Sequence, residues 1–163
     1  MKTVLFVCSA NTCRSPMAEM IFDELIDEHP RLRGKVRSDS AGVLAFDGDD
    51  IMPLARDALL RIGIDGSKHR AKRVNKRLIE EASIILTMEA HHIDELKTLY
   101  PQCEDKTHTL KGYVEGVMGY PDDDCLYDVD DPYRRIDMYE EVASDIKEEI
   151  NKLLILLEEE VEL

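Results

Sequence analysis

The sequence has no tryptophan, few aromatic residues and no long uninterrupted apolar run. A membrane-spanning helix needs about 20 consecutive apolar residues, so no membrane partner is expected. The amino-terminal stretch MKTVLFVCSANTCR has one lysine and only a very short apolar run, which is too brief for a secretory signal peptide. We therefore expect a soluble, cytoplasmic protein.

Basic residues are also scarce. Lysine and arginine number 21 against 35 aspartates and glutamates, which gives a formal charge of −14. Nucleic-acid backbones must be met by clustered basic side chains, so we expect no nucleic-acid partner. The acidity is partly concentrated in 121–131, and a basic stretch covers 66–77. This basic stretch is more typical of a solvated face on or before a helix than of a site for an acidic partner.

Only four cysteines are present. In a chain that is expected to be cytoplasmic, they suggest thiol chemistry or a metal more than a disulfide framework. Cys8 and Cys13 are spaced like half of a zinc site, with Cys103 and Cys125 as conceivable partners. Those two cysteines are far apart in the sequence and supply no second close pair. We therefore expect no metal and no organic cofactor.

Two further features of the sequence argue against a metal site and a nucleotide site. The tandem His91 and His92 are expected to point to different faces of a helix, so that they cannot share a metal. We expect both to be surface or half-buried side chains. The lysine-bearing phosphate loop GxxxxGK[ST] is absent, so nucleoside triphosphate binding has no support.

Short apolar runs alternate with helical patterns along the chain, which is typical of a parallel sheet covered by helices. The expected strands are 3–8, 35–42, 83–88 and 107–110, and the expected helices are 16–29, 53–64, 90–100 and 136–157. Segments 43–52 and 111–135 read as irregular. We predict an α/β fold: a single three-layer domain over residues 1–163, with a central four-stranded parallel sheet flanked by helices.

The stretch CSANTCRSP joins the first strand to the first helix. Such a loop concentrates backbone N–H donors at a helix amino terminus, which is an anion site. Arg14 adds a planar fork suited to phosphate oxygens. In this positive field Cys8 is expected to be a thiolate, with Ser15 close enough to donate a hydrogen bond to its sulfur. The pattern predicts a nucleophile within a phosphate cradle, although Cys8 considered alone reads as an inert buried thiol.

The stretch VCSANTCRSPMAE resembles the amino-terminal signature of low-molecular-weight protein tyrosine phosphatases, with Ala10 where that family usually has glycine. The resemblance covers nearly the whole chain. Further matching segments follow in the family's order: SDSAG (38–42), the GI…HRAK region (63–72), ILTMEAHH (85–92) and DDPY (130–133).

This resemblance implies that Cys8 attacks phosphorus to form a phosphocysteine intermediate, that Arg14 holds the phosphoryl oxygens, and that Asp131 is the general acid. Asp128 and Asp130 would favour a protonated Asp131 through like-charge repulsion. Taken alone, Asp131 in Asp-Pro-Tyr reads as a turn. The resemblance also implies these substrate contacts: Ser9, Ala10, Asn11, Thr12, Cys13, Ser15, Phe46 and Tyr133.

Support for the loop is implied at Asn11, Ser15, Ser40 and His69, with a plain structural role for Ser40 as the alternative. For Phe46 the alternatives are an exposed loop side chain and a core anchor. Cys13 matches a second loop cysteine of the family, which forms a disulfide with the nucleophile on oxidation and so protects it.

The substrate is left open between two classes. The expected activity is hydrolysis of phosphotyrosine in a protein, with inorganic phosphate as product and inhibitor. The alternative is protein-arginine phosphatase activity, because family members with that activity carry threonine at the position of Thr12. Tyr133, where that subgroup is expected to have phenylalanine, speaks against it. Less favoured are a thiol-dependent arsenate reductase, which would need two further cysteines close together, and a catalytically silent phosphate-binding module.

Overall fold

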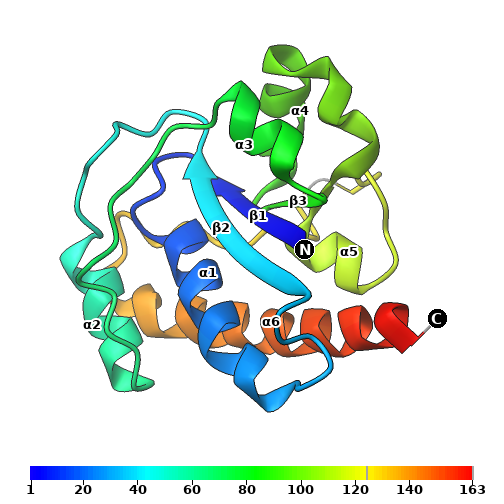
Figure 1. The fold of residues 1–163 in the computed structure, drawn as a ribbon. Helices are drawn as coiled ribbons and strands as arrows, with labels where there is room; N and C mark the ends of the chain where they lie inside the picture. Colours follow the sequence, from blue (N-terminus) through cyan, green and yellow to red (C-terminus); the bar gives the residue numbers. More distant parts are fainter. Residues whose placement is uncertain (124, 163) are drawn as a thin grey trace.

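The computed structural model describes residues 1–123 and 125–162. Its sheet consists of β1 (Lys2–Cys8), β2 (Val36–Gly42), β3 (Ile84–Thr87) and β4 (Thr107–Thr109). The strands lie in the order β2-β1-β3-β4, and every pairing is parallel. Figure 1 shows the first three of these strands. The predicted four-stranded parallel sheet is confirmed. Positions 124, within the acidic run, and 163 lie outside the described residues.

The four expected helices are present, and two short ones were missed. The helices are α1 (Arg14–Leu25), α2 (Pro53–Arg61), α3 (Lys76–Glu81), α4 (Ala90–Leu99), α5 (Leu110–Val114) and α6 (Tyr139–Glu162). Short 3₁₀ segments cover Ile26–Glu28, Pro101–Lys106 and Ile136–Met138. Helices α3 and α5 are too short for apolar periodicity to show, and each depends on a cap: the Asn75 and Thr109 side chains accept from Leu78 N and Gly112 N.

The sheet is buried on both faces, which explains why β1 reads as a continuous apolar run. Phe6 faces a core shared with α1, α2, α5 and α6, whereas Leu5 and Val7 face a second core with α3 and α4. Helix α6 runs along the first of these faces and packs against α1 (Figure 1). The predicted three layers are therefore confirmed.

The carboxyl ends of the strands meet at one edge of the sheet. Cys8, the last residue of β1, pairs in register with Gly42, and Val7 pairs with Thr87. The loops after β1, β2 and β3 therefore begin side by side, which is the edge at which open α/β sheets bind ligands. Among the described residues, no helix has both the length and the apolar character needed to cross a membrane.

Candidate active site

The loop 8–14 is held with its carbonyl groups turned outward. The carbonyls of Cys8, Ser9 and Thr12 accept hydrogen bonds from backbone amides in 43–52. Asn11 has a positive φ of 56°, which turns the chain sharply at the middle of the loop. With these carbonyls engaged outside, the Asn11 amide points inward to the Cys8 sulfur.

Gly42 allows the loop to lie directly on β2. A Cβ atom at this position would be 2.5 Å from the Ser9 carbonyl oxygen and 2.9 Å from the Asn11 amide nitrogen. Both distances are too short for non-bonded atoms, so a side chain here would push the loop outward. The glycine of SDSAG is therefore required by a close backbone approach.

The Cys8 sulfur lies on the inner side of the loop. Its Sγ is 2.9 Å from the Ser15 hydroxyl and accepts a hydrogen bond from the Asn11 amide at 3.3 Å. Cys8 is buried, yet it contributes to the wall of an open pocket. The sulfur is thus in contact with polar groups from both the loop and the first turn of α1.

The Asn11 side chain links the loop to β2. Its Nδ2 donates to the hydroxyls of Ser15, at 2.8 Å, and Ser40, at 2.9 Å, and its Oδ1 accepts from the Lys72 amide. Because both serines accept from Asn11, each keeps its own proton for a further partner. Ser15 can direct its proton to Cys8, and Ser40 donates to Glu19 at 2.5 Å.

His69 holds the same loop from outside. Burial lowers its pKa, so its ring is neutral near pH 7, and its Nε2 lies 2.7 Å from the Asn11 carbonyl oxygen. Because a carbonyl only accepts, Nε2 carries the proton. Asn11, Ser15, Ser40 and His69 therefore form one network around the loop.

Glu19 is a member of this network that the sequence did not reveal. Burial and the neighbouring Asp39 and Asp23 carboxylates raise its pKa to about 7, against the opposing effect of the Ser40 hydrogen bond. Its spacing could have revealed it, because Glu19 lies four residues after Ser15 and so on the same face of α1.

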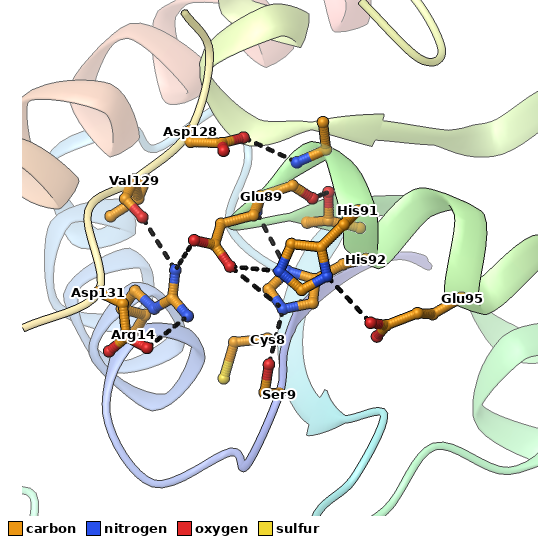
Figure 2. Close-up of polar contacts among 12 residues, drawn as sticks. Cys8, Ser9, Arg14, Glu89, His91, His92, Glu95, Asp128, Val129 and Asp131 are labelled. Carbon is orange, nitrogen blue, oxygen red and sulfur yellow. Dashed lines mark hydrogen bonds and ion pairs between the residues drawn. The ribbon is translucent and has the colours of Figure 1, made fainter. Parts of the chain in front are cut away.

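Arg14 is almost completely buried and is held by three acceptors. Its Nη1 donates to the Val129 carbonyl at 2.9 Å and lies 3.4 Å from Glu89 Oε1, while Nη2 lies 3.6 Å from Asp131 Oδ2 (Figure 2). Neither Val129 nor Glu89 was predicted. Glu89 follows β3 at the carboxyl edge of the sheet, where ligands bind in this class of fold. An acidic residue at that position could therefore have been proposed as part of the site.

A pocket of about 180 Å³ opens over the loop. It is lined by Cys8, Ser9, Ala10, Thr12, Cys13, Arg14, Met52, Asp131 and Tyr133. Asn11 and Ser15, expected to contact substrate, are fully buried, so their side chains support the loop from behind.

The two aromatic residues assigned to the rim have different outcomes. Tyr133 lines the pocket as expected. Phe46 is 74% exposed and is not among the described residues that line it, and Met52 occupies the rim instead. The segment 43–52 therefore does border the pocket, but through its end and not through its aromatic side chain.

Asp131 projects toward the pocket from the segment after α5. Its Oδ1 accepts from the Tyr133 amide at 3.1 Å, and its side chain is about half exposed. Asp128, which was expected to favour a protonated Asp131 through like-charge repulsion, accepts a hydrogen bond from the Ala90 amide at 2.7 Å, at the start of α4 (Figure 2). A carboxylate at a helix amino terminus is stabilised there.

Cys8 and Cys13 both line the pocket, and Cys103 does not join them. Burial and the charge of Cys8 raise the pKa of Cys13 to about 12, although Arg14 opposes them, so Cys13 remains a thiol while lining the pocket. Cys103 is fully buried in the core on the opposite face of the sheet. It can neither complete a zinc site with the loop nor relay a disulfide from it.

His91 and His92 lie closer together than expected. Their ring centroids are 4.2 Å apart, because both rings turn back toward Glu89 at the start of α4. His91 is exposed and His92 is fully buried, which corrects the expectation for the second ring. His92 Nδ1 accepts from the Glu89 amide at 3.1 Å, so its proton is on Nε2, which contacts the Ser9 hydroxyl at 2.9 Å. With Glu89, the two rings each bring one polar side-chain atom within 4.8 Å of the others, so the expectation that they point to different faces is wrong.

Known proteins are similar to this chain in sequence and in fold. The family model described as low molecular weight phosphotyrosine protein phosphatase matches residues 3–163. A protein-arginine-phosphatase of Geobacillus stearothermophilus is 34% identical, over 96% of this chain and 97% of its own. The low molecular weight protein-tyrosine-phosphatase YfkJ of Bacillus subtilis is 33% identical over the full length of both.

A solved structure adds a chemical detail about a relative. It is a mutant of the arginine phosphatase YwlE with serine in place of a cysteine, described as having a phosphorylated active site serine. It is 31% identical, covers 95% of each chain and superimposes with a TM-score of 0.83. From the family match and these relatives, the chain belongs to the low molecular weight phosphotyrosine protein phosphatase family and is a phosphoric monoester hydrolase acting on phosphoproteins.

Proposed function

We propose that the protein removes phosphate from phosphotyrosine in proteins, with Cys8 as nucleophile and Asp131 as general acid. The observation that carries this proposal is the Cys8 sulfur at the pocket wall, 2.9 Å from the Ser15 hydroxyl and beside the Arg14 guanidinium. A phosphoryl group bound over the loop would meet amide hydrogens and a fixed cation around a sulfur nucleophile.

The reaction proceeds in two displacements. The Cys8 thiolate forms an S–P bond as the P–O bond to tyrosine breaks, and Asp131 gives its proton to the leaving oxygen. Asp131, now a carboxylate, takes a proton from water, whose oxygen attacks phosphorus. The S–P bond then breaks and returns the electron pair to Cys8, where the Ser15 hydroxyl stabilises the leaving thiolate. Inorganic phosphate, the product, fits the same loop and is expected to inhibit.

The phosphorylated serine described in the YwlE mutant supports covalent transfer, because it places phosphate on a protein side chain in a relative of the same fold. Tyr133 and Met52 support an aromatic substrate, since both line the pocket and offer apolar surface to a planar ring.

Phosphoarginine is the second candidate, and a specific observation favours it. Thr12 lines the pocket, and its hydroxyl supplies a polar contact for a P–N substrate or its attacking water. A relative similar over nearly the whole chain is named a protein-arginine-phosphatase. Exchange of one hydroxyl for a methyl group in a pocket changes the discrimination between two substrates by roughly 1–3 kcal/mol.

The test compares kcat/KM for matched phosphotyrosine and phosphoarginine peptides in wild type and Thr12→Ile. Higher activity on phosphotyrosine in both proteins supports the proposal. Preference for phosphoarginine in wild type, reversed by Thr12→Ile, establishes the second candidate. An unchanged preference in the variant would remove Thr12 from the determinants of specificity, and no turnover of either peptide would contradict both.

A further inference from the structure

Glu89 occupies the space between the catalytic guanidinium and an imidazole ring. Its Oε1 lies 3.4 Å from Arg14 Nη1, and its Oε2 lies 2.6 Å from His91 Nε2 (Figure 2). The Glu89 side chain is only 20% exposed, so its charge is partly shielded from water. One carboxylate is thus shared between the residue that grips phosphate and a histidine outside the pocket.

His91 is itself fixed by a second acid. Its Nδ1 lies 2.9 Å from Glu95 Oε1, one turn further along α4, so both ring nitrogens face carboxylates. Both nitrogens donate only when the ring is an imidazolium. Burial lowers the pKa of His91, but the hydrogen bonds and charges of Glu95 and Glu89 outweigh it and raise the pKa overall.

A lone carboxylate beside Arg14 has a cost for phosphate binding. Glu89 attracts the guanidinium and repels the incoming phosphoryl oxygens, and each effect weakens the grip on substrate. A positive charge on the far side of Glu89 offsets both effects. When its ring is protonated, His91 supplies the positive charge in that position.

We propose that His91 is a positioning residue for Arg14: its protonated ring holds the Glu89 carboxylate and offsets its charge, so that the guanidinium stays available to the phosphoryl group. The inference rests on the proposed function, because it assumes that the phosphoryl group binds at Arg14. His91 is not among the described residues that line the pocket, so it acts through Glu89 and not on the substrate.

Three other titratable side chains face this unit. Asp131 and Asp128 face it from the segment after α5, and His92 faces it from α4. Burial, with the charges of His91 and Arg14, lowers the pKa of His92 to about 3, so this ring stays neutral. The ring next to Glu89 that gains or loses charge near neutral pH is therefore His91.

The first experiment measures the pKa of His91 by NMR titration of wild type, with and without saturating inorganic phosphate. Linkage is reciprocal, so if protonation of His91 tightens phosphate binding, phosphate must raise the pKa of His91 by the logarithm of the same factor. The control ring in the same spectra is His108, which stacks on Tyr113 in a different part of the fold.

The second experiment measures the phosphate inhibition constant, KM and kcat across pH in variants. His91→Gln should weaken phosphate binding and raise KM by about two- to fivefold, the range expected for a partly exposed ion pair, with a smaller change in kcat. His91→Lys should restore most of the affinity. Glu95→Gln should move the loss of phosphate affinity to lower pH, because it removes one acid that supports the imidazolium. The matched control is His29→Gln, which removes a histidine paired with Glu158 at 3.1 Å.

A pKa rise at His91 but not His108, together with these variant effects, would establish the inference. Phosphate binding that leaves the His91 titration unchanged, or an unaltered inhibition constant in His91→Gln, would overturn it and leave the proposed function standing. Absence of phosphate binding to wild type would contradict both.

Discussion

The Ser15 hydroxyl lies 2.9 Å from the Cys8 sulfur and accepts a hydrogen bond from Asn11 on its other side. Its proton is therefore directed to the sulfur or, at the longer distance of 3.4 Å, to the Ala41 carbonyl. Ser15 thus connects the Cys8 sulfur to Asn11, and neither Ser15 nor Asn11 is among the described residues that line the pocket. The chemistry of Cys8 thus depends on a network behind the loop.

Replacement of Ser15 by alanine should slow the enzyme without unfolding it. A hydrogen bond to a charged group contributes roughly 1.5–3 kcal/mol, which corresponds to about 10- to 100-fold in rate. We expect kcat to fall by that factor and alkylation of Cys8 by iodoacetate at fixed pH to slow in parallel. Normal alkylation and kcat in Ser15→Ala would show that the hydroxyl does not stabilise the thiolate.

Gly42→Ala should damage the loop while the sheet stays folded. The new Cβ would lie 2.5 Å from the Ser9 carbonyl oxygen, so the loop must move outward by about 1 Å, and a shift of that size costs about a hundredfold in rate. Circular dichroism should report native secondary structure, whereas kcat/KM and phosphate affinity should both fall. Wild-type kinetics in this variant would contradict the close approach of loop and strand.

The pH dependence of stability should carry a signature of Glu19. Its pKa rises from an ordinary 4.5 to about 7 on folding, chiefly through burial. Between these values the folded protein binds more protons than the unfolded chain, so this group's contribution to stability falls as pH rises from about 4.5 to about 7.

Glu19→Gln removes that titration and keeps an acceptor for Ser40. The free energy of unfolding of the variant, relative to wild type, should therefore increase across the same pH range. Urea denaturation at several pH values measures the difference. Parallel curves for the two proteins would show that Glu19 titrates alike in the folded and unfolded states.

Asp131→Asn should discriminate between leaving groups. Without an acid, a poor leaving group such as an alkyl alcohol cannot depart readily, whereas an activated aryl phosphate needs little proton donation. We expect a much larger loss of kcat for the poor leaving group. Uniform slowing across a leaving-group series would mean that another residue supplies the proton.

The sequence predicted the strands, the longer helices and the loop after β1 because the signals for these features are local. The run TVLFVC and the stretch CSANTCRSP carry their own signals: a doubly buried strand, a tight turn and a helix start. Strands β2 and β4 were recognised from weaker apolar runs. Helices α3 and α5 escaped because six and five residues are too few to show periodicity.

Contacts between distant segments were harder to foresee. Ser40 and His69 were found only through the family resemblance, since nothing local in 35–42 or 66–77 points to position 11. The carbonyl of Val129 leaves no trace in residue type, because any residue offers one. Met52 lines the pocket and Glu89 contacts Arg14 because of where the tertiary fold places the segments after β2 and β3, which no local pattern reveals.

The central proposal is covalent transfer of phosphate to Cys8. The most direct measurement mixes wild type rapidly with an aryl phosphate, quenches within one turnover and locates phosphate on the protein by mass spectrometry, with Cys8→Ala as the control. Phosphate on Cys8 in wild type, and neither phosphoprotein nor turnover in the variant, is the predicted result. Turnover by Cys8→Ala, or product release from wild type through no phosphorylated intermediate, would contradict the account.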